Sequence, residues 1–181
     1  MHSQSEFLKQ PPNRTPFVLQ VVGYKNSGKT TLITKLILRL KQAGLLVGTV
    51  KHDAHDFDMD KPGTDTWQHQ EAGADITAIS SASRSAVISR RPEPLSVLLG
   101  HMQHADIVLV EGFKQEHYPK IILLRDTNDC ELLSLTNPYM AVMWPQAEPI
   151  RMQAAVPVFA LDEEARIAEG IFKNLTPRTT K

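Results

Sequence analysis

Residues 23–31 read GYKNSGKTT, a stretch that fits the phosphate-binding pattern G-x-x-x-x-G-K-[ST]. Glycines such as Gly23 and Gly28 let backbone N–H groups turn inward around phosphate oxygens, at the positive N-terminus of the following helix. Lys29 then reaches the β- and γ-phosphates, Thr30 places its hydroxyl on Mg²⁺, and Thr31 is available for a further phosphate contact. The stretch therefore predicts a site for a nucleoside triphosphate.

A phosphate loop of this kind usually works with a carboxylate at the end of a neighbouring buried strand, which holds the metal through water. The apolar run DIVLV (106–110) leads directly into Glu111 and Gly112, so Glu111 is the predicted carboxylate for Mg²⁺. Asp106, at the other end of the run, is expected to be a surface turn residue. Lys114 could contact phosphate or an anionic partner, although a lysine after a strand is more often merely exposed.

The segment KHDAHDFDMDKPGTD (51–65) is a long polar loop, and long ordered loops often carry function. Three interpretations stay open: a transition-metal site, a solvated acidic loop, or a loop in which Lys51 and some of the acids face the nucleotide and its Mg²⁺. The H-x-x-H spacing lacks a nearby cysteine and differs from the helical H-E-x-x-H form, which disfavours zinc. The residues at issue are His52, Asp53, His55, Asp56, Asp58 and Asp60.

The base of the nucleotide is harder to assign, because the N-K-x-D run that often reads guanine after a strand is absent. Candidate base contacts lie near Asn137 and between Pro157 and Asp162, and the sequence does not choose between these places.

The elements that must position these residues follow from hydrophobic periodicity, and strands that alternate with helices predict an α/β fold with a mostly parallel sheet and one antiparallel hairpin. Helices are predicted from Thr30 to a stop at Gly44, from Asp65 to Ala72, over LSVLLGHM (95–102), and after a cap at Asp162 with an apolar face of Ala165, Ala168, Ile171, Phe172 and Leu175. Strands are predicted at 17–22, 45–50, 106–110, 120–124, 139–143 and 156–161, and the hairpin is DITAIS and SAVISR with its turn at 81–84.

Composition limits the class of protein. The chain has 181 residues, is 41% hydrophobic and carries no formal net charge, which predicts one compact domain over 17–175 between tails at 1–16 and 176–181. Without a basic surface or a long apolar run, neither nucleic acid nor a membrane is an expected partner. The single cysteine, Cys130, suits a reducing cytoplasm.

Three strings taken together are more specific than the phosphate loop alone: GYKNSGKTT, VKHDAHDFDMDKPGTDTWQHQEAGAD and IVLVEGFKQEHYPKIILLRD. Together they closely resemble the MobB family, the adaptor proteins of molybdopterin-guanine dinucleotide biosynthesis, over about residues 17–126. The resemblance implies a P-loop NTPase-like three-layer fold and a Mg²⁺-dependent, GTP-binding homodimer with weak intrinsic GTPase activity. It also implies a role in assisting the guanylyltransferase that joins GMP to molybdopterin, with molybdopterin itself as a further candidate ligand.

Carried over by position, the family's motifs fall on several groups of residues. The resemblance adds Asn26 and Ser27 to the phosphate loop, and Gly112 and Phe113 to the motif at Glu111. The K-H-x-x-H-D and D-K-P-G elements fall on Lys51, His52, His55, Asp56, Asp60, Lys61, Pro62 and Gly63, without a role for each. The stretch AVMWPQAEPIRM (141–152) departs from the family's pattern, which leaves base specificity open.

The main alternative is a phosphate-loop kinase or ATP-dependent ligase for a small molecule. That chemistry needs an acidic or basic group beside the γ-phosphate, for which Asp56 or Asp60 could serve, and an arginine-rich lid would favour a kinase. The arginines that flank the predicted hairpin, Arg84, Arg90 and Arg91, are more typical of a turn and an edge than of a lid. A third interpretation is a structural module for which nucleotide is only a folding ligand.

Overall fold

The computed structural model describes residues 15–53 and 56–175. These residues form two compact units: the first combines the chain up to His52 with the chain from Leu99 onward, and the second is Asp53–Leu98. His55, residues 1–14 of the predicted N-terminal tail and the predicted C-terminal tail lie outside the described residues. The single domain predicted over 17–175 stays a prediction. No helix in the described ranges is both long enough and apolar enough to cross a membrane.

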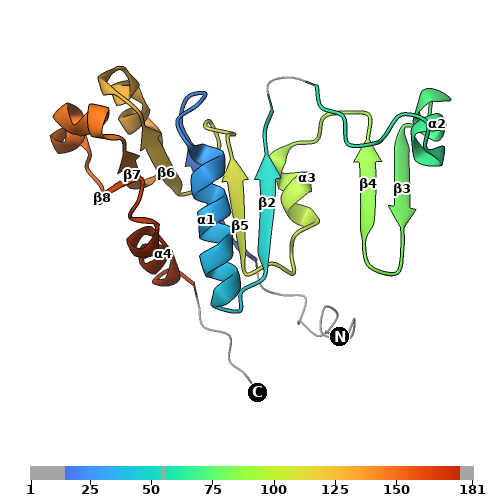
Figure 1. Ribbon diagram of the computed structural model, residues 1–181, viewed down its shortest axis with the longest axis horizontal. Helices are drawn as coiled ribbons and strands as arrows, with labels where there is room; N and C mark the ends of the chain where they lie inside the picture. Colours follow the sequence, from blue (N-terminus) through green and yellow to red (C-terminus); the bar gives the residue numbers. More distant parts are fainter. Residues whose placement is uncertain (1–14, 54–55, 176–181) are drawn as a thin grey trace. The chain divides into compact units, whose positions relative to one another are not determined.

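The first unit is built on a six-stranded sheet whose strand order is β2-β5-β1-β6-β7-β8, with every neighbouring pair parallel (Figure 1). This confirms the predicted mostly parallel α/β fold. All six predicted strands match within two residues at each end, and the last is shorter than predicted by three residues in all. The strands are β1 (Phe17–Val22), β2 (Val47–Lys51), β5 (Ile107–Glu111), β6 (Lys120–Leu124), β7 (Pro138–Met143) and β8 (Val158–Ala160).

Strand β1 lies inside the sheet, between β5 and β6, and all three end at the same edge. In register, Val21 of β1 faces Glu111 of β5 on one side and Ile121 of β6 on the other. The loop that follows β1 therefore begins beside the last residue of β5. This register places the predicted phosphate loop next to the predicted metal carboxylate.

Helices α1 (Lys29–Gln42) and α4 (Glu164–Phe172) cover one face of this sheet (Figure 1). Their buried residues, such as Leu36 and Ile171, share one apolar core with alternate strand residues, such as Leu19 and Val21. Helix α1 ends as predicted: Gly44 has a left-handed φ of 79°, its N–H donates to the Lys41 carbonyl, and the Leu45 N–H reaches back to that of Leu40. That pair of bonds is the Schellman arrangement that stops a helix.

On the opposite face, two 3₁₀ helices, η1 (Thr127–Ser134) and η2 (Pro145–Gln153), pack on β6 and β7 around a second apolar cluster that includes Val22, Ile122 and Met143. The sequence did not predict either helix. Segment η2 carries Pro145 at its start and Pro149 inside it, and its apolar residues do not follow the 3.6-residue period that predicts an α-helix.

The second unit contains α2 (Asp65–Glu71) and the antiparallel hairpin β3 (Ile76–Ser80) and β4 (Ser85–Ser89). The hairpin and its turn are confirmed, since the Ser81 N–H donates to the Arg84 carbonyl at 2.9 Å. Helix α3 (Leu95–Gly100) runs through the junction of the two units in the sequence. It is shorter than the predicted 95–102 segment.

The predicted cap of the last helix is wrong by one residue. Glu163, and not Asp162, precedes α4, and its carboxylate accepts a hydrogen bond from the Ala160 N–H at 2.8 Å. Ile167, absent from the predicted apolar face, is fully buried. At the start of β5, the Asp106 carboxylate accepts the Leu46 N–H at 2.7 Å, so this residue ties β5 to the segment that leads into β2.

Candidate nucleotide-binding site

The phosphate loop joins the end of β1 to the start of α1. Two of its residues have left-handed backbones, Asn26 with φ of 63° and Gly28 with φ of 93°, and the Gly28 carbonyl already accepts the Leu32 N–H of the helix. The first N–H groups of a helix have no partner inside it and carry its positive dipole end. The loop therefore presents unpaired donors at a positive terminus, which is the setting that binds phosphate.

Gly23 is needed for close packing. A Cβ at this position would lie 2.6 Å from Ser27 Oγ and 3.0 Å from the Leu123 carbonyl oxygen of β6. Both contacts are too short for a carbon atom, and the second involves backbone. Glycine therefore lets the start of the loop lie directly against β6, with the Ser27 hydroxyl buried beneath it.

Lys29 lies along the loop that it is predicted to serve. Its ammonium donates to the carbonyls of Gly23 at 3.0 Å and Tyr24 at 2.8 Å. Partial burial lowers the pKa of Lys29, with a smaller lowering from nearby Lys51, while the charge of Glu111 raises it. A cation held between backbone oxygens and a carboxylate can redirect its N–H groups to phosphate oxygens without leaving the site.

The predicted metal ligands lie together. Thr30 Oγ1 donates to both carboxylate oxygens of Glu111, at 3.2 Å in each case. Mg²⁺ prefers hard oxygen donors. The Thr30 hydroxyl and the Glu111 carboxylate thus fit Mg²⁺ in type, and they lie close enough together for Thr30 to bind the ion while Glu111 holds a water of its shell.

A transition metal finds less support. Over residues 15–53 and 56–175, no three His, Cys, Asp or Glu side chains gather as a metal site requires. His52 instead supports the backbone beside Glu111: its N–H donates to the Glu111 carbonyl at 2.9 Å, and its ring lies 4.7 Å from that of Phe113. His55, the other histidine of the predicted pair, is outside the described part of the chain.

The backbone turns sharply after Glu111. Gly112 and Phe113 both have left-handed φ angles, of 88° and 51°. A Cβ on Gly112 would lie 3.1 Å from His52 Cβ, so both the conformation and the close approach favour glycine. The turn brings Lys114 back toward the phosphate loop, where its ammonium lies 5.5 Å from the centre of the Tyr24 ring.

Lys51 ends β2 opposite Glu111 in the register of the sheet. The sheet edge thus brings together the predicted residues Lys29, Thr30, Lys51 and Glu111, with Lys114 beside the loop. Glu131 of η1 also reaches this edge, because its carboxylate accepts the Tyr24 hydroxyl.

Asp60, Lys61 and Gly63 belong to the second unit, where they shape the start of α2. The Asp60 carboxylate accepts hydrogen bonds from the Lys61 N–H at 2.8 Å, Thr64 Oγ1 at 2.9 Å and Gln70 Nε2 at 3.0 Å. Hydrogen bonding from Thr66 and then from Thr64 lowers the pKa of Asp60, and burial opposes this only in part. In the described structure this carboxylate therefore organises its own loop, and a ligand-binding role for the three residues stays a prediction.

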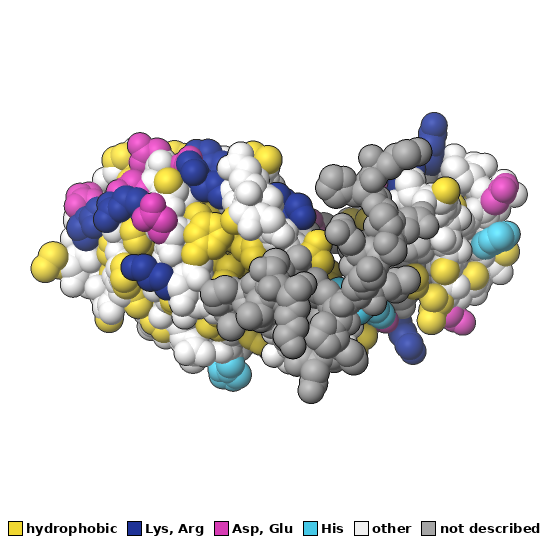
Figure 2. All heavy atoms as spheres, turned by 90° about the horizontal axis from the view of Figure 1, so that it is seen from below, with side chains coloured by type: hydrophobic (Ala, Val, Ile, Leu, Met, Phe, Trp, Pro, Cys, Tyr) yellow, Lys and Arg dark blue, Asp and Glu magenta, His cyan; other side chains and the backbone are white. Residues whose placement is uncertain are grey.

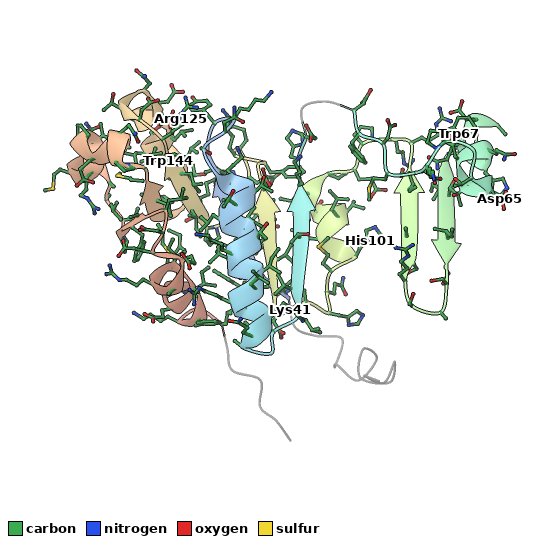
Figure 3. All side chains as sticks on the ribbon, in the orientation of Figure 1. Lys41, Asp65, Trp67, His101, Arg125 and Trp144 are labelled. Atoms are coloured by element: carbon green, nitrogen blue, oxygen red, sulfur yellow. The ribbon has the colours of Figure 1, made fainter. Side chains whose placement is uncertain are left out.

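Trp144 contacts the phosphate loop and is a residue that the sequence analysis did not single out. Its indole N–H donates to the Ser27 carbonyl at 2.9 Å, and its ring carbon Cζ2 would lie 3.8 Å from a Cβ at Gly28 (Trp144 is labelled in Figure 3). Trp144 directly follows β7, so a large aromatic residue at the end of a buried strand was the available signal.

A cavity of about 500 Å³ opens beside Trp144, at the ends of β7 and β8. Its walls are mostly apolar, with charged groups among them. Of the two predicted places for base contacts, the 157–162 segment contributes to this cavity, whereas Asn137 lies before β7, at the opposite end of that strand. The lining residues are Lys35, Met143, Trp144, Pro145, Glu148, Arg151, Ala160, Leu161 and Asp162.

Comparison with known proteins identifies relatives of this chain. The family model "Molybdopterin guanine dinucleotide synthesis protein B" (MobB) matches residues 18–144. A probable molybdopterin-guanine dinucleotide biosynthesis adapter protein of Bacillus subtilis is 34% identical over 157 residues, which cover 84% of this chain and 90% of the relative. The corresponding adapter protein of Escherichia coli is 40% identical over 115 residues, or 60% of this chain and 66% of the relative.

The fold agrees with these matches. The crystal structure of Bacillus subtilis MobB superposes with a TM-score of 0.76 and 31% identity, over 89% of this chain and 99% of that one. The family match includes both the phosphate loop and Glu111 in a P-loop NTPase-like fold. The chain therefore belongs to the MobB family of molybdopterin-guanine dinucleotide biosynthesis adapter proteins.

Proposed function

We propose that this protein binds GTP with Mg²⁺ and assists the attachment of GMP to molybdopterin, as an accessory protein of the molybdenum cofactor guanylyltransferase. The observation that carries the proposal is the contact of Thr30 with Glu111 beside a phosphate loop whose Lys29 already lies across it. The names of the relatives supply the pathway. Molybdopterin is proposed as a further ligand, and the cytoplasm as the place of action.

The cavity beside Trp144 supports a purine nucleoside as the rest of the ligand. It adjoins Gly28, its apolar walls can stack on a planar base, and Asp162 lies at its rim. Within the described residues, the Asp162 carboxylate has no recorded hydrogen-bond or ion-pair partner, whereas Glu148 is paired with Arg151 at 2.7 Å. A free carboxylate can accept both N–H donors on the Watson–Crick edge of guanine, but adenine offers it only the exocyclic amine, so we infer a preference for GTP.

The mechanism that we propose is positioning. Bound Mg²⁺ would neutralise phosphate charge, while Lys29, Thr30 and Glu111 fix the orientation of the triphosphate. The sequence offers no obvious arginine finger or general base for hydrolysis, so intrinsic GTP hydrolysis should be slow. A turnover comparable to that of a working kinase, without any partner, would contradict this mechanism.

We also propose a homodimer, formed through the hairpin of the second unit. Two large apolar side chains on one face of this hairpin, Ile76 and Val87, are exposed. Hydrophobic side chains are visible on the surface of this unit at the right of Figure 2. The same unit carries acids on and near α2, such as Asp65 and Asp75, and Arg84, Arg90 and Arg91 around β4. A surface with apolar side chains and both signs of charge can pair with a second copy of itself.

Equilibrium competition between GTP and ATP in the presence of Mg²⁺ tests the central proposal, with Lys29→Ala as the control variant. We expect GTP to displace a fluorescent guanine nucleotide at a lower concentration than ATP does, and the variant to lose both. A preference for ATP would instead support the small-molecule kinase or ligase. Equal binding of both nucleotides with no effect of Lys29→Ala would remove the phosphate loop from the function.

A further inference from the structure

Two polar residues are fully buried in the sheet beside the candidate site, and neither is among the residues predicted to bind nucleotide. Gln20 interrupts the apolar strand β1, and Lys120 opens β6; both have no exposed surface. They are paired in the parallel register of the two strands. Because paired residues of parallel strands point to the same face of a sheet, their side chains lie together, on the face opposite α1.

Both side chains bond to one loop, residues 112–119, which connects Glu111 to β6. Gln20 Nε2 donates to the carbonyl oxygens of Gly112 at 3.1 Å and Phe113 at 2.6 Å. Lys120 Nζ donates to the carbonyls of Glu116 and, at 3.1 Å, Tyr118. Gln20 thus holds the start of the loop, and Lys120 holds its end.

The loop start needs such support. Gly112 and Phe113 have consecutive left-handed backbones, and φ of 51° is unfavourable for a bulky residue such as Phe113. The two carbonyls held by Gln20 belong to these two residues. The Gln20 amide therefore stabilises the turn that fixes the direction in which Glu111 leaves β5.

Burial of polar groups in a largely apolar sheet costs free energy. The cost is visible in both residues. Gln20 Oε1 has no recorded partner, and burial lowers the pKa of Lys120, although the charge of Glu116 opposes this. Two hydrocarbon side chains would fill the same space without this cost, so what distinguishes the pair is its hydrogen bonds to the loop.

We infer that Gln20 and Lys120 are positioning residues for the metal: they fix the 112–119 loop so that Glu111 meets Thr30. The inference rests on the proposed function for its magnesium readout. Its second readout, the local stability of the loop, is independent of nucleotide.

Gln20→Leu and Lys120→Met test it, because each keeps the size and removes the donors. The affinity for a fluorescent GTP analogue is measured with Mg²⁺ and with EDTA. We expect affinity with Mg²⁺ to fall about tenfold, and affinity with EDTA to change less than about twofold, because the loop acts through the metal carboxylate. Hydrogen exchange of the amides of residues 112–118 should become faster in both variants without nucleotide.

Matched controls separate positioning from general stability. Tyr139→Phe removes another partly buried hydrogen bond of this unit, from the Tyr139 hydroxyl to the Gly170 carbonyl at 2.6 Å. It should lower the melting temperature and leave the magnesium dependence unchanged. Gly112→Ala distorts the same turn from the His52 side and should reproduce the magnesium defect.

The inference is overturned if Gln20→Leu and Lys120→Met lower only the melting temperature, as is expected of Tyr139→Phe. In that case the hydrogen exchange of residues 112–118 and the magnesium dependence of binding would stay at wild-type values. Lys120→Met acts at the other end of the loop and gives the same test if Gln20→Leu does not fold. Failure of the wild-type protein to bind Mg²⁺ and nucleotide would instead contradict the proposed function, and the exchange measurement would still decide the role of the pair.

Discussion

Trp144 makes two kinds of contact with the phosphate loop, one polar and one apolar. Its indole N–H holds the Ser27 carbonyl, while its ring lies against Gly28 and forms part of the adjoining cavity wall. A side chain in this place can link occupation of the cavity to the conformation of the loop. The effect of its two contacts can be separated by substitution.

Trp144→Phe keeps an aromatic ring but loses the indole donor. One such hydrogen bond contributes about 1 kcal/mol, so we expect the affinity for Mg²⁺ and GTP to fall about fivefold. Trp144→Ala also removes the apolar wall of the cavity, and it should weaken the binding of GTP more than the binding of free triphosphate. Titration calorimetry with both ligands measures the difference. Equal losses for GTP and triphosphate in Trp144→Ala would show that the cavity does not hold the nucleoside.

Asp162 allows a narrower test of the base preference. Asp162→Asn keeps the size but replaces a carboxylate, which only accepts hydrogen bonds, by an amide that also donates. We expect the ratio of GTP to ATP affinity to fall by about tenfold, with little change in the affinity for ATP. Glu148→Gln is the control, since Glu148 lines the same cavity and is already paired with Arg151. A ratio that stays at the wild-type value in Asp162→Asn would contradict the assignment.

The residues that the sequence identified and those that it missed differ in a physical way. Lys29, Thr30 and Glu111 were predictable because a loop between a strand and a helix, or the end of an apolar run, leaves a local pattern. Gln20 and Trp144 act through bonds to residues 92 and 117 positions away. No local pattern encodes such partners, so neither residue received a predicted role from the sequence.

At the scale of elements, helices α1 and α4 are joined by charged side chains at the edge of their common apolar core. Glu164, in the first turn of α4, pairs with Arg39 at 2.9 Å and Lys35 at 3.6 Å, both on α1. The hydrogen bond from Arg39 is the largest of the causes that lower the pKa of Glu164. This contact holds α4 against the helix that begins at the phosphate loop.

Because the pKa of the Glu164 carboxylate is lowered in the folded state, its contribution to stability decreases as the pH falls. The contribution of Glu164 is complete above the pKa of the unfolded chain, about 4.3, and is lost as pH falls through the lower pKa of the folded state. Glu164→Gln should therefore have a smaller free energy of unfolding than wild type at pH 7, and the difference should shrink below about pH 4. Urea unfolding across this range measures it.

Glu169→Gln is the matched control, because Glu169 is an exposed acid on the same helix. Its free energy of unfolding should follow that of the wild type at every pH. A Glu164→Gln difference that persists unchanged at acidic pH would mean that the packing of the side chain matters, and its charge does not.

The elements themselves were largely predictable, and the exceptions have a common cause. Apolar runs bounded by Gly, Pro or charged residues marked the strands, and α1 and the hairpin have clear periods. The 3₁₀ helices were missed because they have little period of their own and are held by packing on β6 and β7. Strand order was also beyond the sequence, although it is what sets Glu111 next to the phosphate loop.

At the scale of the whole molecule, the two units differ in how they bury apolar side chains. The first unit has a closed core between its sheet and the helices on each face. The second offers a two-stranded sheet on which Val87 is 67% exposed and Ile76 is 56% exposed. In the register of the two strands, Val87 pairs with Ala78 and Ile76 pairs with Ser89. Val87 and Ile76 therefore lie on the same face of the hairpin.

A two-stranded hairpin is only marginally stable alone in water, and open strand edges readily pair with another chain. Within the described residues, neither outer edge of this hairpin pairs with a further strand. A second copy that covers the shared face of Ile76 and Val87 would bury apolar surface on both chains at once. The proposed dimer would therefore add to the stability that α2 gives this hairpin by packing on β3.

Val87→Lys should disrupt that dimer, because it places a charge in the middle of the apolar face where the two copies would meet. We expect wild type to sediment as a dimer at micromolar concentration and the variant as a monomer, with the first unit still folded and binding nucleotide. Met152→Lys, at a 93% exposed position on η2, is the control and should remain dimeric. A dimeric Val87→Lys protein would place the dimer contact elsewhere on the chain. A monomeric wild type would mean that the exposed face of the hairpin binds a different partner. The guanylyltransferase would be the first candidate, and its co-sedimentation with wild type and with Val87→Lys would test it.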